Sequence, residues 1–255
     1  MSEYYSLAVD GHVITVTLQQ PEISNSLDSA ACLALHELFD EFERNPQWWV
    51  AVITGAGERA FCAGMNLKNV AKGEPLRLPP SGFAGLTHRF DNSKPVIAAV
   101  NGAAYGGGLE MALACDIVIA AEHAIFALSE PRVGVAALAG GVHRLARQIG
   151  LKQAMGMLLN GRKVSAAEAH ELGFVNEVVP AAELMATAQR WAAEIAACAP
   201  LAVRATKQLA MSGLDLPLRE AMAASYPMVT AMLNSPDMVE GARAFAERRA
   251  PNWQG

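Results

Sequence analysis

A chain of 255 residues with 52% hydrophobic and 18% charged residues can bury a full core, and its composition excludes the disordered class. Its net charge of -5 argues against nucleic acid as a partner, because phosphate binding needs clustered lysines and arginines. The four cysteines form no CxxC pair, and the first residues lack the basic and apolar stretches of a secretion signal. We therefore expect reduced thiols, no metal, no membrane segment and a cytoplasmic location.

The N-terminal part of the chain predicts a β-hairpin followed by an amphipathic helix. Strand-forming residues 7–9 and 12–18 flank Asp10 and Gly11, a dipeptide that favours a tight turn. After Asp28, apolar residues recur at helical spacing and acidic residues fill the other face. Further buried strands are expected at residues 49–55, 95–102 and 116–121. Strands that alternate with helices predict an α/β fold with parallel pairing.

The later part of the chain is helical in pattern. Residues 72–82 are dense in proline and glycine, so we expect a loop there, of the kind that can cover a site. Beyond Pro180 almost every segment has helical spacing. We therefore divide the chain into an α/β catalytic core at residues 1–180 and a helical C-terminal region at residues 181–255.

Three successive glycines, Gly106 to Gly108, lie between a strand end and a helix expected at residues 109–115. The N-terminus of a helix has unpaired N–H groups that favour anions, and glycine lets a substrate approach the backbone. A tight packing turn between strand and helix explains the same glycines equally well. A nucleotide-binding loop fits less well, because neither GxGxxG nor GK[ST] is present.

Two glutamates are candidates for acid–base chemistry. Glu110 follows Gly107 by three residues on an otherwise apolar helix, so burial should raise the pKa of its carboxyl group. Glu130 follows an apolar run at a strand end, where α/β enzymes place site residues. Structural roles stay open for both: an ion pair or a backbone cap for Glu110, and a solvated loop charge for Glu130.

A second run of small residues, 61–65 (FCAGM), follows the strand at 49–55 and offers further backbone donors. Cys62 lies in an apolar stretch with no histidine that can be assigned to it, so we expect it to be a packing residue and not a nucleophile. Neither GxSxG nor HExxH is present in the chain.

Four motifs that occur in order resemble the crotonase (enoyl-CoA hydratase/isomerase) superfamily. They are residues 61–68 (FCAGMNLK), 94–102 (KPVIAAVNG), 106–110 (GGGLE) and 140–145 (GGVHRL). The resemblance extends to residues 244–249 and so covers nearly the whole chain. It implies a spiral of ββα turns and a helical C-terminal region that forms a homotrimer or a dimer of trimers.

The resemblance also implies roles for residues. Met65 and Gly107 would supply the N–H groups of an oxyanion hole for the enolate oxygen of a thioester. Glu110 and Glu130 match the two glutamates of the hydratases: one would activate water for attack at Cβ, while the other, Glu130 in the usual assignment, would protonate Cα.

The partner implied is an acyl-CoA substrate, with coenzyme A entering as part of the substrate and no separate cofactor. The positions that match substrate or CoA contacts are Asn25, Leu27, Ala63, Gly64, Asn66, Leu67, Lys68, Gly106, Phe245 and Arg248. The last two would come from a neighbouring subunit.

The chain departs from common hydratases at Met65, Asn66 and Ser129, which puts acyl specificity in question. Residues 80–87 (PSGFAGLT), 126–130 and 141–145 are most similar to the carnitinyl-CoA dehydratase (crotonobetainyl-CoA hydratase) branch. Reversible hydration of a 2-enoyl-CoA is the leading hypothesis. The alternatives are crotonobetainyl-CoA hydration, double-bond isomerisation or C–C cleavage on the same scaffold, and a non-catalytic assembly or RNA-binding subunit.

Overall fold

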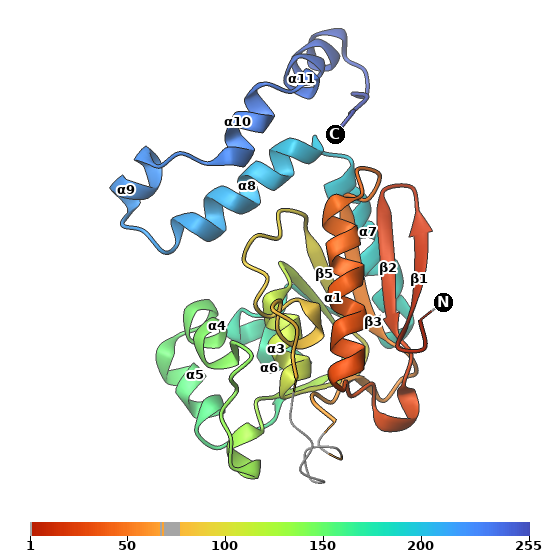
Figure 1. Cartoon of the computed structure of the whole chain (residues 1–255), viewed down its shortest axis with the longest axis vertical. Coiled ribbons are helices and arrows are strands. Elements are labelled where there is room, and N and C mark those ends of the chain that lie inside the picture. The colour runs from red at the N-terminus through yellow and green to blue at the C-terminus, as the bar shows by residue number, and fades with distance from the viewer. Residues whose placement is uncertain (1, 67, 69–76) are drawn as a thin grey trace.

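A computed structural model describes residues 2–66, 68 and 77–255, and a six-stranded sheet runs through it (Figure 1). In spatial order its strands are β1 (Tyr5–Asp10), β2 (Val13–Leu18), β3 (Val50–Gly55), β5 (Val96–Val100), β7 (Ile117–Ala121) and β10 (Glu177–Val179). The hairpin β1–β2 is antiparallel, and every later pairing is parallel. The expected hairpin and parallel α/β sheet are therefore confirmed.

A second, four-stranded sheet consists of β4 (Ala60–Cys62), β6 (Ala103–Tyr105), β8 (Ile125–Ala127) and β9 (Val164–Ser165). The chain alternates between the sheets, from β3 to β4, from β5 to β6 and from β7 to β8, and so forms successive turns of a spiral. Because β4, β6 and β8 are parallel neighbours, the segments that follow them meet at one edge. Those segments carry Met65, Gly107, Glu110 and Glu130.

Alternation of side chains along the strands divides the core into two layers. Ala51 and Ile53 of β3 face the larger apolar cluster, while Val50 and Val52 face a smaller one. The helix α1 (Ser29–Arg44) covers the first face, and α7 (Leu184–Ala196) covers the second (Figure 1). The side chain of Asp28 caps α1 by accepting the N–H of Ala31 at 2.9 Å, which explains where that helix begins.

The remaining helices follow the spiral. Helix α3 (Gly107–Ala114) begins two residues earlier than expected, because Gly107 and Gly108 adopt helical geometry. The others are α4 (Gly141–Gln148), α5 (Leu151–Leu158), α6 (Ala166–Leu172), α8 (Pro200–Gly213), α9 (Leu218–Ala223), α10 (Pro227–Leu233) and α11 (Pro236–Glu247). Short 3-10 helices are η1 (Pro21–Ile23), η2 (Phe83–Gly85), η3 (Glu130–Val133) and η4 (Ala181–Glu183).

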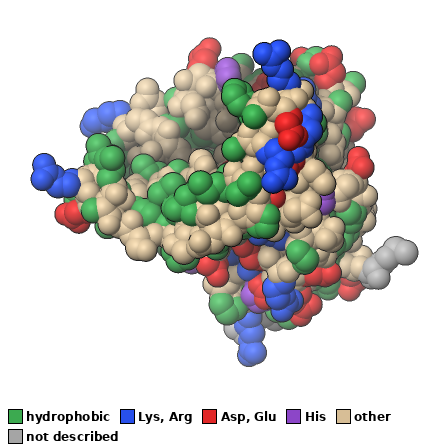
Figure 2. All heavy atoms as spheres, turned by 90° about the horizontal axis from the view of Figure 1, so that it is seen from above, with side chains coloured by type: hydrophobic (Ala, Val, Ile, Leu, Met, Phe, Trp, Pro, Cys, Tyr) green, Lys and Arg blue, Asp and Glu red, His purple; other side chains and the backbone are tan. Residues whose placement is uncertain are grey.

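Helices α8 to α11 extend away from the sheets (Figure 1), and Figure 2, which looks onto this end, shows hydrophobic side chains gathered along it. Large apolar side chains that remain exposed on these helices and their linkers include Met211, Leu214, Leu218, Met222 and Phe245. The division between residues 1–180 and 181–255 stays a prediction, although α7 packs on the sheet with the first part. Among the described residues no helix is long and apolar enough to cross a bilayer.

Candidate active site

The glycine turn ends β6 and starts α3. Gly106 adopts φ 51° and ψ -123°, a conformation that glycine tolerates best, and its N–H donates to the carbonyl of Ala127 at 2.9 Å. The next N–H, on Gly107, donates to no acceptor in the part of the chain that the structure describes. The N-terminus of α3 therefore presents an unpaired donor at the edge where β4, β6 and β8 end.

A short bridge fixes Met65 beside this turn. The N–H of Leu27 donates to the carbonyl of Gly64 at 2.9 Å, and the N–H of Asn66 donates back to Leu27 at 2.8 Å. Between these two bonds the N–H of Met65 is left without an acceptor among the described residues. The structure thus brings the two N–H groups predicted as oxyanion donors onto neighbouring loops.

Gly64 sets the spacing between the loops. Its φ is 90°, and a Cβ atom there would lie 2.8 Å from the carbonyl oxygen of Tyr105 and 3.0 Å from the nitrogen of Gly107. Gly108 packs as closely on the other side, since a Cβ on it would collide with the carbonyl of Cys62. The three glycines therefore form a tight packing turn, and this turn also presents an N–H group without an acceptor among the described residues.

Glu110 is 3% exposed and lies one turn into α3. Its Oε1 accepts the N–H of Gly141 at 2.9 Å, at the start of α4. Burial raises the pKa of Glu110 to about 7; the Gly141 hydrogen bond opposes that rise, and the nearby Glu130 carboxylate adds to it. Glu110 thus accepts a backbone N–H, which is the structural role that the sequence left open. Its raised pKa also suits acid–base chemistry.

Glu130 lies beside the glycine turn, against Gly106. It opens η3 and is not the last residue of a strand, because β8 ends at Ala127. Its Oε1 would be 3.2 Å from a Cβ on Gly106, and its buried Oε2 has no hydrogen-bond partner among the described residues. Burial raises the pKa of this carboxyl group as well. A fully solvated loop charge is therefore excluded, and a buried carboxylate oxygen without a partner among the described residues lies beside Gly106.

Phe83 was not identified from the sequence. Its ring covers Gly107, because a Cβ on that glycine would lie 2.9 Å from Cε1 and Cζ of the ring. The loop that carries Phe83 is held by the N–H of Phe83 donating to Oγ1 of Thr87 at 2.9 Å. Phe83 belongs to the segment PSGFAGLT at residues 80–87, whose sequence indicates the branch of the superfamily but not a position over Gly107.

The positions that match CoA contacts lie in different parts of the structure. Leu27, Ala63, Gly64, Asn66 and Gly106 lie on the loops just described, whereas Leu67 lies outside the described residues. Asn25 is fully buried: its side-chain amide donates to the carbonyls of Ala56 and Ala60, and its backbone N–H donates to Gln20, so its observed contacts are structural. Lys68 is exposed.

Phe245 and Arg248 lie at the end of α11, which Figure 1 shows at the opposite end of the molecule from α3. Phe245 is 87% exposed. Within one chain these two residues are not brought to the glutamates, and their contribution from a neighbouring subunit stays a prediction.

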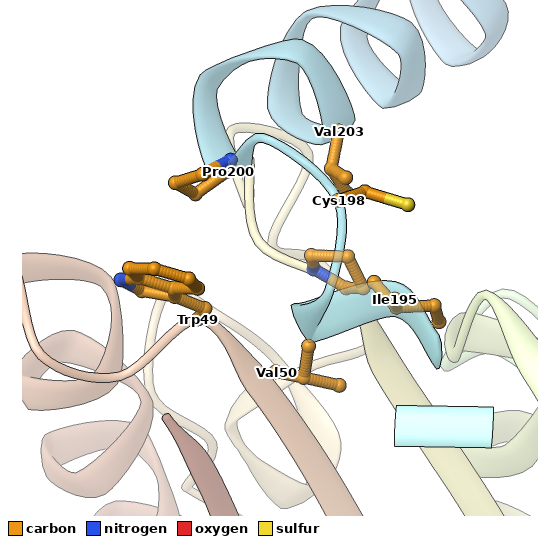
Figure 3. A pocket seen from close by; sticks show the side chains of 7 residues that line it. Trp49, Val50, Ile195, Cys198, Pro200 and Val203 are labelled. Carbon is orange, nitrogen blue, oxygen red and sulfur yellow. The ribbon is translucent and has the colours of Figure 1, made fainter. Parts of the chain in front are cut away.

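Other features of the chain lie apart from this site. Cys62 is fully buried, and burial raises the pKa of its thiol to about 12, as expected of a packing residue. Figure 3 shows a small apolar pocket between α7, α8 and the start of β3, lined by Trp49, Val50, Pro95, Ile195, Cys198, Pro200 and Val203. Among the described residues no group of three His, Cys, Asp or Glu side chains is placed to hold a metal ion.

Comparison with known proteins agrees with this geometry. The family model for enoyl-CoA hydratase/isomerase matches residues 9–255. Carnitinyl-CoA dehydratase of Salmonella typhi is 42% identical over a 264-residue alignment that covers all of both chains. The crystal structure of an enoyl-CoA hydratase from Mycobacterium tuberculosis superposes with a TM-score of 0.93 at 35% identity over the full length of both chains. A carnitinyl-CoA hydratase from Mycobacterium avium gives 0.79 at 38% identity, covering 100% of this chain and 99% of the other. The chain therefore belongs to the enoyl-CoA hydratase/isomerase family, and its fold is the crotonase spiral.

Proposed function

We propose that this chain is a hydro-lyase that adds water reversibly to the double bond of a 2-enoyl-CoA thioester. The observation that carries the proposal is a pair of carboxyl groups whose pKa values are raised by burial, one in the first turn of the helix that starts at Gly107 and one beside Gly106. Members of the family that only move a double bond need one such group. A pair suits the transfer of two protons in one turnover.

In the proposed mechanism the thioester oxygen accepts the N–H groups of Met65 and Gly107. These donors stabilise the negative charge that develops on that oxygen as the enolate forms. They are main-chain groups held by the Leu27 bridge and by α3, so they need little reorganisation during the reaction.

The two glutamates then share the proton transfers. Glu110, with a pKa of about 7, is substantially ionised at neutral pH and takes a proton from water as the oxygen bonds to Cβ. Glu130 supplies the proton that Cα receives. The product has gained one water molecule, and proton exchange with solvent resets both carboxyl groups. Dehydration follows the same steps in reverse.

The test is turnover of a panel of 2-enoyl-CoA thioesters, beginning with crotonyl-CoA and followed by loss of the enoyl thioester absorbance. Mass analysis of the product separates hydration from isomerisation, because isomerisation adds no water. Failure of the whole panel would refute hydratase activity. Saturable RNA binding without thioester turnover would favour a non-catalytic subunit instead.

The residue assignment is tested by Glu110→Gln and Glu130→Gln. Each is expected to lower kcat by roughly 10²-fold or more while the protein stays folded. Glu171→Gln is the control, because Glu171 is exposed on α6. Near-normal kcat in either active-site variant would remove that glutamate from the mechanism.

Crotonobetainyl-CoA is a second candidate substrate, supported by the full-length similarity to carnitinyl-CoA dehydratases. Its kcat/KM relative to crotonyl-CoA, measured with the same preparation, decides between the two. A higher value for crotonyl-CoA would assign the chain to general enoyl-CoA hydration.

We further propose that the chain assembles as a homotrimer or a dimer of trimers through its C-terminal region. The exposed apolar side chains of α8 to α11 support this, because isolated soluble subunits rarely expose so many together. Light scattering coupled to size-exclusion chromatography gives the mass directly, and a monomer at micromolar concentration would contradict the proposal. A cytoplasmic location and the absence of a separate cofactor stay predictions.

A further inference from the structure

Arg144 lies at the fourth residue of α4, yet its guanidinium group turns back to the start of that helix. A Cβ on Gly140, the residue that precedes α4, would collide with Nη1 of Arg144. A cation at a helix N-terminus opposes the helix dipole, and partial burial adds to the cost. Burial accordingly lowers the pKa of Arg144. An arginine held in this place needs compensating contacts.

Three interactions compensate for the cost of burying this charge at a helix N-terminus. Nη2 of Arg144 donates to the carbonyl oxygen of Thr87 at 2.9 Å. Its Cζ lies 5.7 Å from the centre of the Phe90 ring, within the range of a cation–π interaction. The third is the charge of Glu110, whose Oε1 accepts the N–H of Gly141, the residue directly after Gly140 on which Arg144 packs; this charge raises the pKa of Arg144, and that of Arg144 lowers the pKa of Glu110.

Thr87 connects Arg144 to the oxyanion turn. The carbonyl of Thr87 accepts the guanidinium group, and its hydroxyl oxygen accepts the N–H of Phe83. The ring of Phe83 in turn covers Gly107. One side chain on α4 therefore contacts the loop whose Phe83 covers one predicted donor.

Groups from three segments influence the charge on Glu110. Helix α4 contributes the N–H of Gly141 and the positive charge of Arg144, the segment before α4 contributes a backbone hydrogen bond from Ala139, and η3 contributes the negative charge of Glu130. Two further titratable side chains lie on the loop, His88 with Nδ1 at 3.3 Å from Oγ1 of Thr87 and Arg89 in an ion pair with Asp40 of α1.

Resting on the proposed role of Glu110, we propose that Arg144 is a positioning residue: its charge favours the carboxylate form of Glu110, and its hydrogen bond to Thr87 holds the loop that seats Phe83 on Gly107. A lysine would keep the charge but lacks the planar fork that reaches Thr87 while packing on Phe90. The two parts of the role can therefore be separated by substitution.

The charge is tested by titrating Glu110 itself, which does not depend on turnover. Carbon-13 NMR of glutamate side-chain carboxyl groups in the whole protein, assigned with Glu110→Gln, gives the pKa directly. Arg144→Gln and Arg144→Met are expected to raise the pKa of Glu110. Arg144→Lys and the control Arg147→Gln, an exposed arginine on the same helix, are expected to leave it unchanged. An unchanged pKa in a folded neutral variant overturns the charge role.

The positioning is tested by kinetics with the preferred 2-enoyl-CoA. Arg144→Lys is expected to lower kcat while the pH profile stays that of the wild type, and wild-type kcat in this variant overturns the positioning role. Thr87→Val removes the hydroxyl that holds Phe83 and is expected to lower kcat without moving the pKa of Glu110. If no thioester is turned over by the wild type, the proposed function fails, and the NMR titration still decides whether Arg144 acts on Glu110.

Discussion

A methyl group on Gly64 would lie where the two predicted oxyanion donors meet. The Cβ position is 3.0 Å from the nitrogen of Gly107 and 2.8 Å from the carbonyl oxygen of Tyr105, so one of the loops has to move. That movement would separate Met65 from Gly107. Loss of one oxyanion-hole donor costs about 10²- to 10³-fold in kcat. We expect the kcat of Gly64→Ala to fall in that range.

The same substitution also strains the backbone, and a matched glycine separates the two effects. Gly64 has φ 90°, and Gly173, which ends α6, has φ 96° with no described atom within 4 Å of its Cβ position. Forcing alanine into this conformation costs roughly 1–2 kcal/mol in either place. Gly173→Ala should therefore lose stability but keep wild-type kcat, whereas Gly64→Ala should lose both.

Urea unfolding followed by circular dichroism gives the stability of both variants, and initial rates with the best 2-enoyl-CoA give kcat and KM. The reasoning depends on kcat, because loss of an oxyanion donor reduces the stabilisation of the transition state more than it reduces the affinity for substrate. A Gly64→Ala protein that is folded and turns over at the wild-type rate would refute the assignment of Met65 and Gly107 as donors.

Three further predictions follow from buried polar groups. The pKa of Glu110 is about 7 in the folded state against an ordinary 4.5. Between pH 4.5 and 7 the folded state therefore binds more protons than the unfolded state, and stability falls as pH rises through this range. Urea unfolding should find Glu110→Gln more stable than the wild type by about 1–3 kcal/mol at pH 8, with no such gain at pH 4; equal stability at both pH values would contradict the raised pKa. Asn25→Ala leaves buried carbonyls unpaired and should cost about 2–4 kcal/mol in urea unfolding without raising the KM for the thioester; a raised KM at normal stability would restore the side chain as a substrate contact. Asp237, 3% exposed, accepts the backbone N–H groups of Gln254 and Gly255, so Asp237→Asn should cost about 1 kcal/mol and speed hydrogen exchange at those two amides, and unchanged exchange would contradict the contact.

Local sequence patterns predicted the secondary-structure elements that depend on neighbouring residues. The turn at Asp10 and Gly11 and the cap at Asp28 act within a few residues, so the hairpin and α1 could be predicted. The buried strands β3, β5 and β7 are nearly uniform apolar runs and were predicted for the same reason. The glutamates and predicted donors were identified by ordered motifs, because spacing alone left a packing turn and a backbone cap open.

Longer-range contacts lay beyond sequence reasoning. The partner of Glu110 is the N–H of Gly141, 31 residues away, and nothing near Glu110 predicts which helix starts there. Phe83 reaches Gly107 only because its loop folds across the spiral. Asn25 matched a CoA-contact position by resemblance alone, and its side-chain hydrogen bonds to residues 31 and 35 positions later could not be predicted. Each of these depends on packing between elements that are distant in the chain.

The N–H groups of Met65 and Gly107 belong to the main chain, and this has a consequence for how the family diversifies. A mutation at position 65 changes the side chain but leaves the peptide N–H in place, since every residue except proline carries one. If these are the oxyanion donors, as proposed, selection can vary the surface that meets the acyl group without removing the groups that stabilise the thioester oxygen. On such a scaffold, a new substrate needs new side chains around main-chain donors that stay in place.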